Sequence, residues 1–530
     1  MELDLKRDKF QKSQNVFMEK SSKLFNKIET QNLKFWGHNC FSIESKSNVL
    51  IIDPWFSEKG AFFSSWYQYP KNNFFKDDVL RLLSKKNNSY IFISHEHEDH
   101  LDENFLKSIP SKTNLIIPNY FDKTLKKIIG KYTKNIIECK DNEEFYLNSE
   151  IKIVLKISDV GVNNDASILI NTKEFSFFNQ NDCKIFDRLS EIKQDITFYS
   201  TQFSGANAHP STFMFSDEKK IELSIKKVNA KLNNVLKGIK TLKPSYFLPA
   251  AGPAIFPFLD SDLSLGKNNI FIHQDYLNKF LLRNGVKNTI YLKPGNFFKK
   301  KYVDPIPPPT LEEISSYKKK IFNTWDQIPN NLDRNALEKS IFDRFAKIED
   351  IKLQNCPILI FNYSGLFNEN DSTRNHKVFI DLNTKTLLEN FNYSSSFMEI
   401  ISSKKYFNLM TSKRWQNVSL SFKAKIVVKP DQFNNDLNLF LFSDLSNIRN
   451  NFITTKKRVK ERIIVKSKEG RCFKVDKYCP HQKANLSRAE LYENELICPA
   501  HGWKFDLEEN GLDKQSNLSI NAEEINNETN

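Results

Sequence analysis

Residues 479–503 read CPHQKANLSRAELYENELICPAHGW. Two short pairs lie in this stretch, Cys479 with His481 and Cys498 with His501, and sixteen residues separate them. A proline follows each cysteine. Two loops of this kind can close on one [2Fe–2S] cluster, because thiolates then hold one iron and neutral imidazoles hold the other. The alternative is a Cys₂His₂ zinc site, but a zinc finger usually pairs Cys with Cys and His with His.

The residues around this motif carry a resemblance. The run His501-Gly502-Trp503-Lys504-Phe505-Asp506, followed by Gly511, resembles the Rieske proteins and the Rieske-type oxygenases. The resemblance implies a small all-β Rieske domain, which we predict over residues 431–530. The implied cluster ligands are Cys479, His481, Cys498 and His501.

A second group of potential ligands follows an apolar run at residues 90–93, which predicts a buried strand. The chain continues as His95-Glu96-His97-Glu98-Asp99-His100. Alternate residues at a strand end point the same way, so His95 and His97 can grip one metal ion. Asp99 and His100 then project to a second metal position. The alternative is a solvated turn, which four potential ligands in six residues disfavour.

The H-x-H-x-D-H pattern after an apolar strand resembles the metallo-β-lactamase superfamily over roughly residues 33–295. Trp36-Gly37-His38 and Asp53-Pro54-Trp55 resemble its lactonase and phospholipase branch. The resemblance implies an α/β (α+β) fold, with two sheets sandwiched between helices and metals at one sheet edge. We therefore predict an αββα sandwich over residues 31–300.

The same resemblance bears on the remaining ligands. Asp182 resembles the metal-bridging aspartate of the superfamily, and His209 is a ligand candidate whose alternative role is that of a loop histidine. Asp159 stands where a further ligand could come, or is a turn residue. The final histidine of the family has no counterpart in residues 248–253, and His273 and His376 are alternatives for it.

Composition and charge limit the remaining classes. The chain has 530 residues, 39% of them hydrophobic, which predicts several packed domains. We predict a helical arm over 1–30 and a substrate-shaping α/β region over 301–430. A helix is predicted at 217–243 from its apolar periodicity, with a lysine-rich face most simply explained as solvated.

The net charge of +14 favours an anionic partner, or reflects a lysine-rich background. No arginine-rich arm or RNA-binding signature points to nucleic acid. Seven scattered cysteines do not form a disulfide framework. The apolar stretch 247–259 is interrupted by prolines and is too short to span a bilayer. With no apolar leader in the first twenty residues, these features predict a cytoplasmic protein without a membrane span.

The two motifs together resemble the CMP-N-acetylneuraminate monooxygenase (hydroxylase) family, which joins a Rieske domain to a metallo-β-lactamase-like domain. Asp53-Pro54-Trp55-Phe56, Asn179-Gln180-Asn181-Asp182-Cys183 and residues 415–433 carry this resemblance. Residues 415–428 are predicted as a strand and 396–415 as a helix. The vertebrate members of the family carry the Rieske part first, whereas here it is last.

The resemblance implies hydroxylation of a CMP-activated sialic acid, or a related nucleotide sugar, with O₂ and electrons from a reductase, cytochrome or ferredoxin. His95, His97, Asp99 and His100 would be catalytic, holding iron or zinc together with Asp182 and His209. Two other classes stay open. One is a metal-dependent hydrolase with a redox-sensing Rieske domain, and the other is an electron-transfer protein whose hydrolase-like domain is a docking scaffold.

Overall fold

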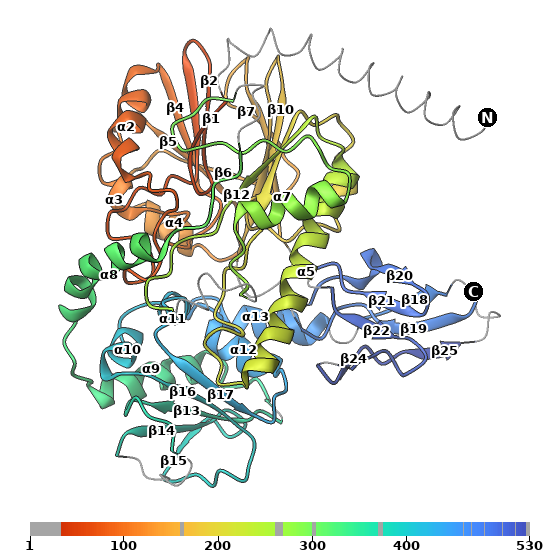
Figure 1. Cartoon of the computed structure of the whole chain (residues 1–530). Helices are drawn as coiled ribbons and strands as arrows, with labels where there is room; N and C mark the ends of the chain where they lie inside the picture. The colour runs from red at the N-terminus through yellow and green to blue at the C-terminus, as the bar shows by residue number, and fades with distance from the viewer. Residues whose placement is uncertain are drawn as a thin grey trace.

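The computed structural model describes residues 33–158, 164–259, 269–298, 304–353, 355–368, 375–458, 461–467, 469–481, 483–500, 502–514 and 516–525 (Figure 1). The side chains of residues 319–324 and 326 are not among those described. The predicted arm over 1–30, Asp159 and His501 lie outside the described residues.

The first sheet of the N-terminal half has the strand order β1-β2-β3-β4-β5-β6. Pairing is antiparallel from β1 to β3 and parallel from β3 to β6. Its central strands are runs of apolar residues, which favour a sheet covered on both faces. The bounds are β1 (Leu33–Gly37), β2 (Cys40–Glu44), β3 (Asn48–Ile52), β4 (Asn88–Phe92), β5 (Asn114–Pro118) and β6 (Ile136–Cys139).

The second sheet has the order β12-β11-β10-β9-β8-β7. The strands from β10 to β12 are parallel, and those from β7 to β10 are antiparallel. The bounds are β7 (Glu144–Tyr146), β8 (Lys152–Ile157), β9 (Ala166–Asn171), β10 (Ser176–Asn179), β11 (Phe198–Gln202) and β12 (Tyr246–Ala250).

Three apolar clusters stack these layers. Leu50 and Phe92 of the first sheet meet Ile168 and Phe177 of the second in one buried cluster. A second cluster joins the outer face of the first sheet to η2 (Asn73–Phe75), α2 (Lys76–Lys85), α3 (Glu103–Leu106) and α4 (Thr124–Ile129). A third joins the second sheet to η3 (Leu189–Glu191), α5 (Asp217–Leu242) and α7 (Gln274–Arg283). The predicted αββα sandwich is therefore confirmed.

The helix α5 confirms the prediction at residues 217–243. The hydroxyl of Ser216 accepts a hydrogen bond from the backbone N–H of Lys219 and caps the first turn. Val228, Leu232 and Val235 recur at helical spacing and are buried against the second sheet. Figure 1 shows that α5 runs on from this sheet between the two remaining parts of the chain.

The middle of the chain forms a sheet of order β15-β14-β13-β16-β17. Its strands are β13 (Ile358–Asn362), β14 (Lys377–Asp381), β15 (Thr386–Leu388), β16 (Phe397–Ile401) and β17 (Lys425–Lys429). The helices of this part are α8 (Leu311–Asp326), α9 (Arg334–Lys347), α10 (Lys404–Met410), α11 (Trp415–Ser419), α12 (Asn435–Phe442) and α13 (Ile448–Arg458). The apolar residues of α12 and α13 join the core of this sheet, beyond the predicted boundary at residue 430. The domain boundaries stay predictions.

Two sequence-based predictions in this part were wrong. Residues 415–428 are not one strand, because α11 takes the first five and β17 begins only at Lys425. Residues 396–415 are not one helix, because β16 precedes α10. Ser402 and Ser403 separate the strand from the helix. After α11 ends at Ser419, Phe422 has a φ of 56° and turns the chain before β17 begins.

The C-terminal part is all-β apart from one short turn of helix, η4 (Leu486–Arg488). Its two sheets have the orders β18-β19-β25 and β20-β21-β22-β23-β24, around a core that includes Phe473, Leu496 and Phe505. The bounds are β18 (Arg462–Lys466), β19 (Cys472–Asp476), β20 (Glu490–Tyr492), β21 (Glu495–Ile497), β22 (Lys504–Asp506), β23 (Leu512–Asp513), β24 (Leu518–Ser519) and β25 (Glu523–Ile525). None of the helices among the described residues combines the length and apolarity that crossing a bilayer requires.

Candidate functional site

Side chains from three loops converge where β4 ends. Among the described residues there are two groups of potential metal donors, in each of which the donor atoms lie within 4.8 Å of one another. The first group is His38, Asp99 and His100, and the second is His95, His100 and Asp182. Because both groups share His100, their donors surround one continuous site. Imidazole nitrogens and carboxylate oxygens are ligands that suit iron as well as zinc.

The donor atoms of this site fit a metal ion. The Nε2 atom of His100 lies 3.6 Å from Oδ1 of Asp182 and 3.8 Å from Oδ2 of Asp99. His100 Nε2, Asp182 Oδ1 and Asp165 Oδ1 are buried and have no hydrogen-bond partner among the described residues. Buried polar atoms are nearly always paired, so the unpaired atoms of His100 and Asp182, which share one donor group, match ligands of a bound cation. Asp165 lies beside this group, with its Oδ1 3.5 Å from Nδ1 of His95.

Asp53 orients the shared histidine. Its Oδ2 atom lies 2.9 Å from Nδ1 of His100, which turns Nε2 of that ring toward the donor groups. The same carboxylate accepts hydrogen bonds from the Ser94 hydroxyl at 2.7 Å and from the Asn39 amide at 2.9 Å. A carboxylate behind a histidine is the usual support for a metal ligand.

His97 lies at the edge of this site and belongs to neither group. Its Nδ1 atom is 2.8 Å from Nε2 of His95, and its Nε2 atom is 2.6 Å from Nε2 of Gln416 in α11. Burial lowers the pKa of His95 well below its usual range and that of His97 to about 4. Both rings are therefore neutral near pH 7, which is the protonation state that binds metal.

The helix α11, in the middle part of the chain, covers the loop of residues 95–100, which we call the His/Asp loop. Arg414, just before α11, contacts Glu96 Oε1 at 2.9 Å and Asp444 Oδ2 at 2.6 Å. The amide of Asn417 donates to Oε1 of Glu98 at 3.0 Å. The middle part of the chain thus forms one wall of the site.

The other predicted metal ligands lie elsewhere. His209 joins neither donor group and packs on Phe213, with ring centroids 4.8 Å apart. His273 precedes α7 beside Tyr69, and His376 lies beside Tyr363. Among the described residues, none of the three belongs to a donor group.

Sequence reasoning missed His38, Asp53 and Asp165 as members of this site. His38 stands in the tight turn between β1 and β2 with a φ of 52°, and its Nε2 lies 3.2 Å from Oδ2 of Asp99. The sequence did offer a signal for two of them. His38 and Asp53 belong to the motifs Trp36-Gly37-His38 and Asp53-Pro54-Trp55, which lie at the same edge of the first sheet. Asp165 carries no such signal.

The two cysteines of the C-terminal motif are both buried, each with 1% of its surface exposed. Burial, and then the neighbouring Cys498 thiol, raises the pKa of Cys479 well above its usual range. Their loops are closed by backbone hydrogen bonds from Cys479 to Ala484 and from Cys498 to Trp503. Two adjacent, buried thiols fit the cysteine-bound iron of a [2Fe–2S] cluster.

His481 leaves this core toward the rest of the molecule. Its ring stacks on Trp503 with centroids 4.4 Å apart, and Phe433 meets it edge-on at 4.6 Å. Burial, followed by the charges of Lys184 and Lys227, lowers the pKa of His481 to about 3. Its neutral ring is the form that binds a cluster iron. Trp503 also packs on the core of the C-terminal part, so this tryptophan contacts both that core and the ring of His481.

The C-terminal part docks on α5 and on the loop after Asp182 (Figure 1). The amide of Asn234 donates to the backbone oxygen of Ala500 at 3.3 Å, and Lys237 pairs with Glu490 at 2.7 Å. Arg488 lies 3.0 Å from Asp187. We call this contact region between α5, the 182–188 loop and the two cysteine loops the seam.

The lysine-rich side of α5 is not simply solvated, which corrects the sequence-based interpretation. Lys227 and Lys231 are partly buried at the seam, whereas Lys240 on the same helix is exposed. Their ammonium groups donate to oxygens of Gln202, Asn207 and His209, contacts that the helix sequence alone does not encode.

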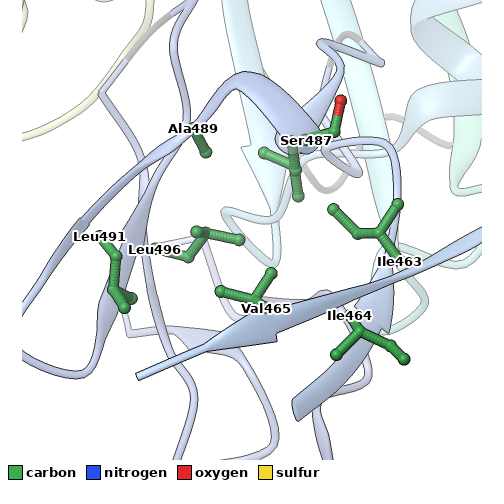
Figure 2. Close-up of a pocket in the computed structure, with 8 residues that line it drawn as sticks. Ile463, Ile464, Val465, Ser487, Ala489, Leu491 and Leu496 are labelled. Carbon is green, nitrogen blue, oxygen red and sulfur yellow. The ribbon is translucent and has the colours of Figure 1, made fainter. Parts of the chain in front are cut away.

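The C-terminal part also holds an apolar pocket of about 460 Å³, shown in Figure 2. Aliphatic side chains of β18, β20 and β21 line it, with Ser487 as a polar member. It offers no metal ligand and no charged group, so the chemistry belongs to the two donor sets above.

Two segments of the chain match models of known domain families. Residues 32–160 match the model of a beta-lactamase superfamily domain, and residues 439–517 match that of a Rieske [2Fe-2S] domain. The chain joins a metallo-β-lactamase-like domain to a C-terminal Rieske domain. The Rieske domain implies a [2Fe–2S] cluster, and the metallo-β-lactamase-like domain implies iron or zinc at its own site.

Individual relatives are distant. A Rieske 2Fe-2S iron-sulfur protein of Mycolicibacterium smegmatis is 26% identical over 43% of this chain and 44% of its own length. The cytidine monophosphate-N-acetylneuraminic acid hydroxylase of Mus musculus is 23% identical over 49% of this chain and 45% of its own. The chain thus spans less than half of the length of these relatives. CmlA, a diiron beta-hydroxylase from Streptomyces venezuelae, aligns over 51% of this chain and 54% of its own at 15% identity, with a TM-score of 0.34.

Proposed function

We propose that the protein is an oxygenase that hydroxylates a CMP-activated sialic acid, or a related nucleotide sugar, with O₂ and electrons from an external reductase, cytochrome or ferredoxin. His38, His95, His97, Asp99, His100 and Asp182 hold the catalytic metal. Cys479, His481, Cys498 and His501 hold the cluster. When bound, the cluster supplies one electron at a time and the second metal supplies the centre for O₂ chemistry.

One observation carries this proposal: residues next to the His/Asp metal site and residues next to the cluster motif meet at the same seam. Asp182 begins the loop in which Asp187 lies 3.0 Å from Arg488 of the C-terminal part. On the neighbouring helix α5, Asn234 donates at 3.3 Å to the backbone oxygen of Ala500, two residues after Cys498. Asp182 belongs to the metal group, and Cys498 belongs to the cluster motif. A redox sensor or a docking scaffold needs no such proximity, whereas an oxygenase that passes electrons from cluster to metal does.

The residues of this chain prepare the site for the reaction. Asp53 fixes the His100 ring, and burial keeps His95 and His97 neutral. The helix α11 covers the His/Asp loop and excludes water from that side. Exclusion of water protects reactive species and strengthens electrostatic interactions within the site.

The substrate class rests on the relatives and on charge. The mouse relative is named for hydroxylation of cytidine monophosphate-N-acetylneuraminic acid, and this chain aligns with 45% of it. A net charge of +14 agrees with an anionic substrate.

Product analysis tests the proposal. Protein loaded with both metal centres is reduced chemically and given CMP-N-acetylneuraminate under isotopically heavy O₂. We expect a product that is heavier by one oxygen atom derived from O₂, as mass spectrometry detects. His100→Ala should abolish this product while leaving the cluster absorption in place. Release of free CMP without oxygen incorporation would contradict the proposal and favour the metal-dependent hydrolase.

A further inference from the structure

We propose that Lys184, Lys227 and Lys231 form a binding site for a phosphate ester of the substrate, at the seam between the metal site and the Rieske cluster. This inference rests on the proposed function for the identity of the whole substrate, but the anion site stands on its own geometry. For Lys227 and Lys231 the sequence pattern predicted only a solvated helix face.

The three side chains come from two elements that meet. Lys227 and Lys231 are one helical turn apart on α5, so they lie on the same face of the helix. Lys184 follows Asp182 in the loop after β10. After burial, the charges of Lys184 and Lys231 act together to lower the pKa of Lys227 to about 7. All three side chains are partly buried, and the charges of Lys184 and Lys231 both reach Lys227.

The two helix lysines are held by neutral groups. Lys227 Nζ donates to the backbone oxygen of His209 at 2.5 Å and to the side-chain oxygen of Asn207. Lys231 Nζ donates to the side-chain oxygen of Gln202. Within the described part of the chain, neither ammonium forms an ion pair with a carboxylate. The amides orient the two cations without neutralising them.

Such an arrangement does not stabilise the fold. Like charges at i and i+4 destabilise a helix, and partial burial of cations carries a further desolvation cost. Burial is the main reason that the pKa of Lys231 falls to about 8. A bound anion removes both penalties, because it favours the charged form of every lysine around it. A phosphate ester offers several oxygens to the ammonium donors, and such hydrogen bonds are charge-assisted.

The place of this cation cluster fits a substrate group. Lys231 donates to the side chain of Gln202, whose backbone N–H donates at 2.9 Å to the oxygen of Asn181, the residue before Asp182 of the metal group. Ala230, the residue before Lys231, lies against Gly502 of the second cysteine loop. A phosphate held here keeps the rest of the substrate beside the metal donors and beneath the Rieske domain. The Rieske domain contacts the same helix through Asn234 and Lys237, so binding of the phosphate is expected to depend on docking of that domain.

Calorimetry with CMP and with cytidine tests the site directly on the protein loaded with both metal centres. We expect CMP to bind at least about tenfold more tightly than cytidine, since only CMP carries the phosphate. Lys227→Gln and Lys231→Gln should each weaken CMP binding about tenfold and leave cytidine binding unchanged. Lys240→Gln, on the exposed part of the same helix, is the matched control and should bind CMP like the wild type.

The outcomes separate this inference from the proposed function. Lysine-dependent CMP binding without hydroxylation of CMP-N-acetylneuraminate supports the anion site and overturns the oxygenase. Hydroxylation with a KM that neither lysine substitution changes supports the oxygenase and overturns the anion site. Equal affinity of CMP and cytidine also overturns the anion site. Circular dichroism and the visible absorption of the cluster verify that each variant is folded, and Lys231→Arg, which keeps the charge, should retain CMP binding.

Discussion

At the scale of single residues, Asp53 supports the metal site through His100. It bonds Nδ1 of that ring, on the side away from the Nε2 atom that faces the other donors. It is fully buried with 1% of its surface exposed, and it holds both Ser94 and His100. The carboxylate behind His100 selects which ring nitrogen faces the site. Loss of that carboxylate therefore leaves every direct donor in place but releases the ring they share.

We predict that Asp53→Asn weakens metal affinity at the His/Asp site by about 10–100-fold. The substitution is nearly isosteric, so the fold and the [2Fe–2S] content should not change. Metal content after dialysis against a limiting chelator measures the effect, and the visible absorption of the cluster reports on the second site. Asp78→Asn, which removes an exposed carboxylate on α2, is the control. Equal metal retention in both variants would contradict the role given to Asp53.

The same scale shows what a sequence pattern can and cannot locate. His95, Asp99 and His100 follow one strand, so local spacing was enough to predict that they come together. His38 and Asp165 reach the site only because separate strands pair and two sheets stack, and such contacts are invisible in local spacing. His209 was a plausible ligand by its position after a strand, yet its ring packs on Phe213 instead.

At the scale of elements, α11 joins the middle sheet to the His/Asp loop through Arg414. The guanidinium contacts Glu96, whose side chain is 5% exposed, and Asp444, whose side chain is 14% exposed. Burial raises the pKa of Glu96 to about 7, while Arg414 acts to lower it. Removing the cation would leave two buried carboxylates facing each other.

We predict that Arg414→Met destabilises the protein by about 2–4 kcal/mol, since breaking a buried ion pair leaves unpaired charge. The apparent melting temperature, followed by tryptophan fluorescence, should fall by several degrees. Arg81→Met removes an arginine whose pair with Asp78 is largely exposed, and it should have no measurable effect. A melting temperature of Arg414→Met that matches Arg81→Met would show that α11 does not hold the loop.

The helices differ in how far the sequence predicted them. Apolar residues recur at helical spacing along the whole of α5, so the sequence predicted both the helix and its buried face. The short α11 was predicted as strand, because the alternation of Leu420, Phe422, Ala424 and Ile426 was extended back over it. Whether the lysines of α5 face solvent depends on tertiary contacts, such as that of Lys231 with Gln202, which the apolar period of the helix does not encode.

At the scale of the whole molecule, α5 and the 182–188 loop bring the two donor sets to one seam. The contacts of Asn234, Lys237 and Arg488 place the Rieske loops on this surface. His481 then lies on the side of its domain that faces Lys184 and Lys227. We infer that electrons cross this seam from the cluster to the metal when substrate is bound.

Rapid mixing tests that claim most directly. Fully reduced protein is mixed with O₂ in the presence or absence of CMP-N-acetylneuraminate, and oxidation of the cluster is followed by its visible absorption. We predict that substrate accelerates cluster oxidation in the wild type, and that His100→Ala, which lacks the donor shared by both metal groups, stays slow with or without substrate. Equal rates of cluster oxidation in the wild type and in His100→Ala, both indifferent to substrate, would contradict electron transfer across the seam.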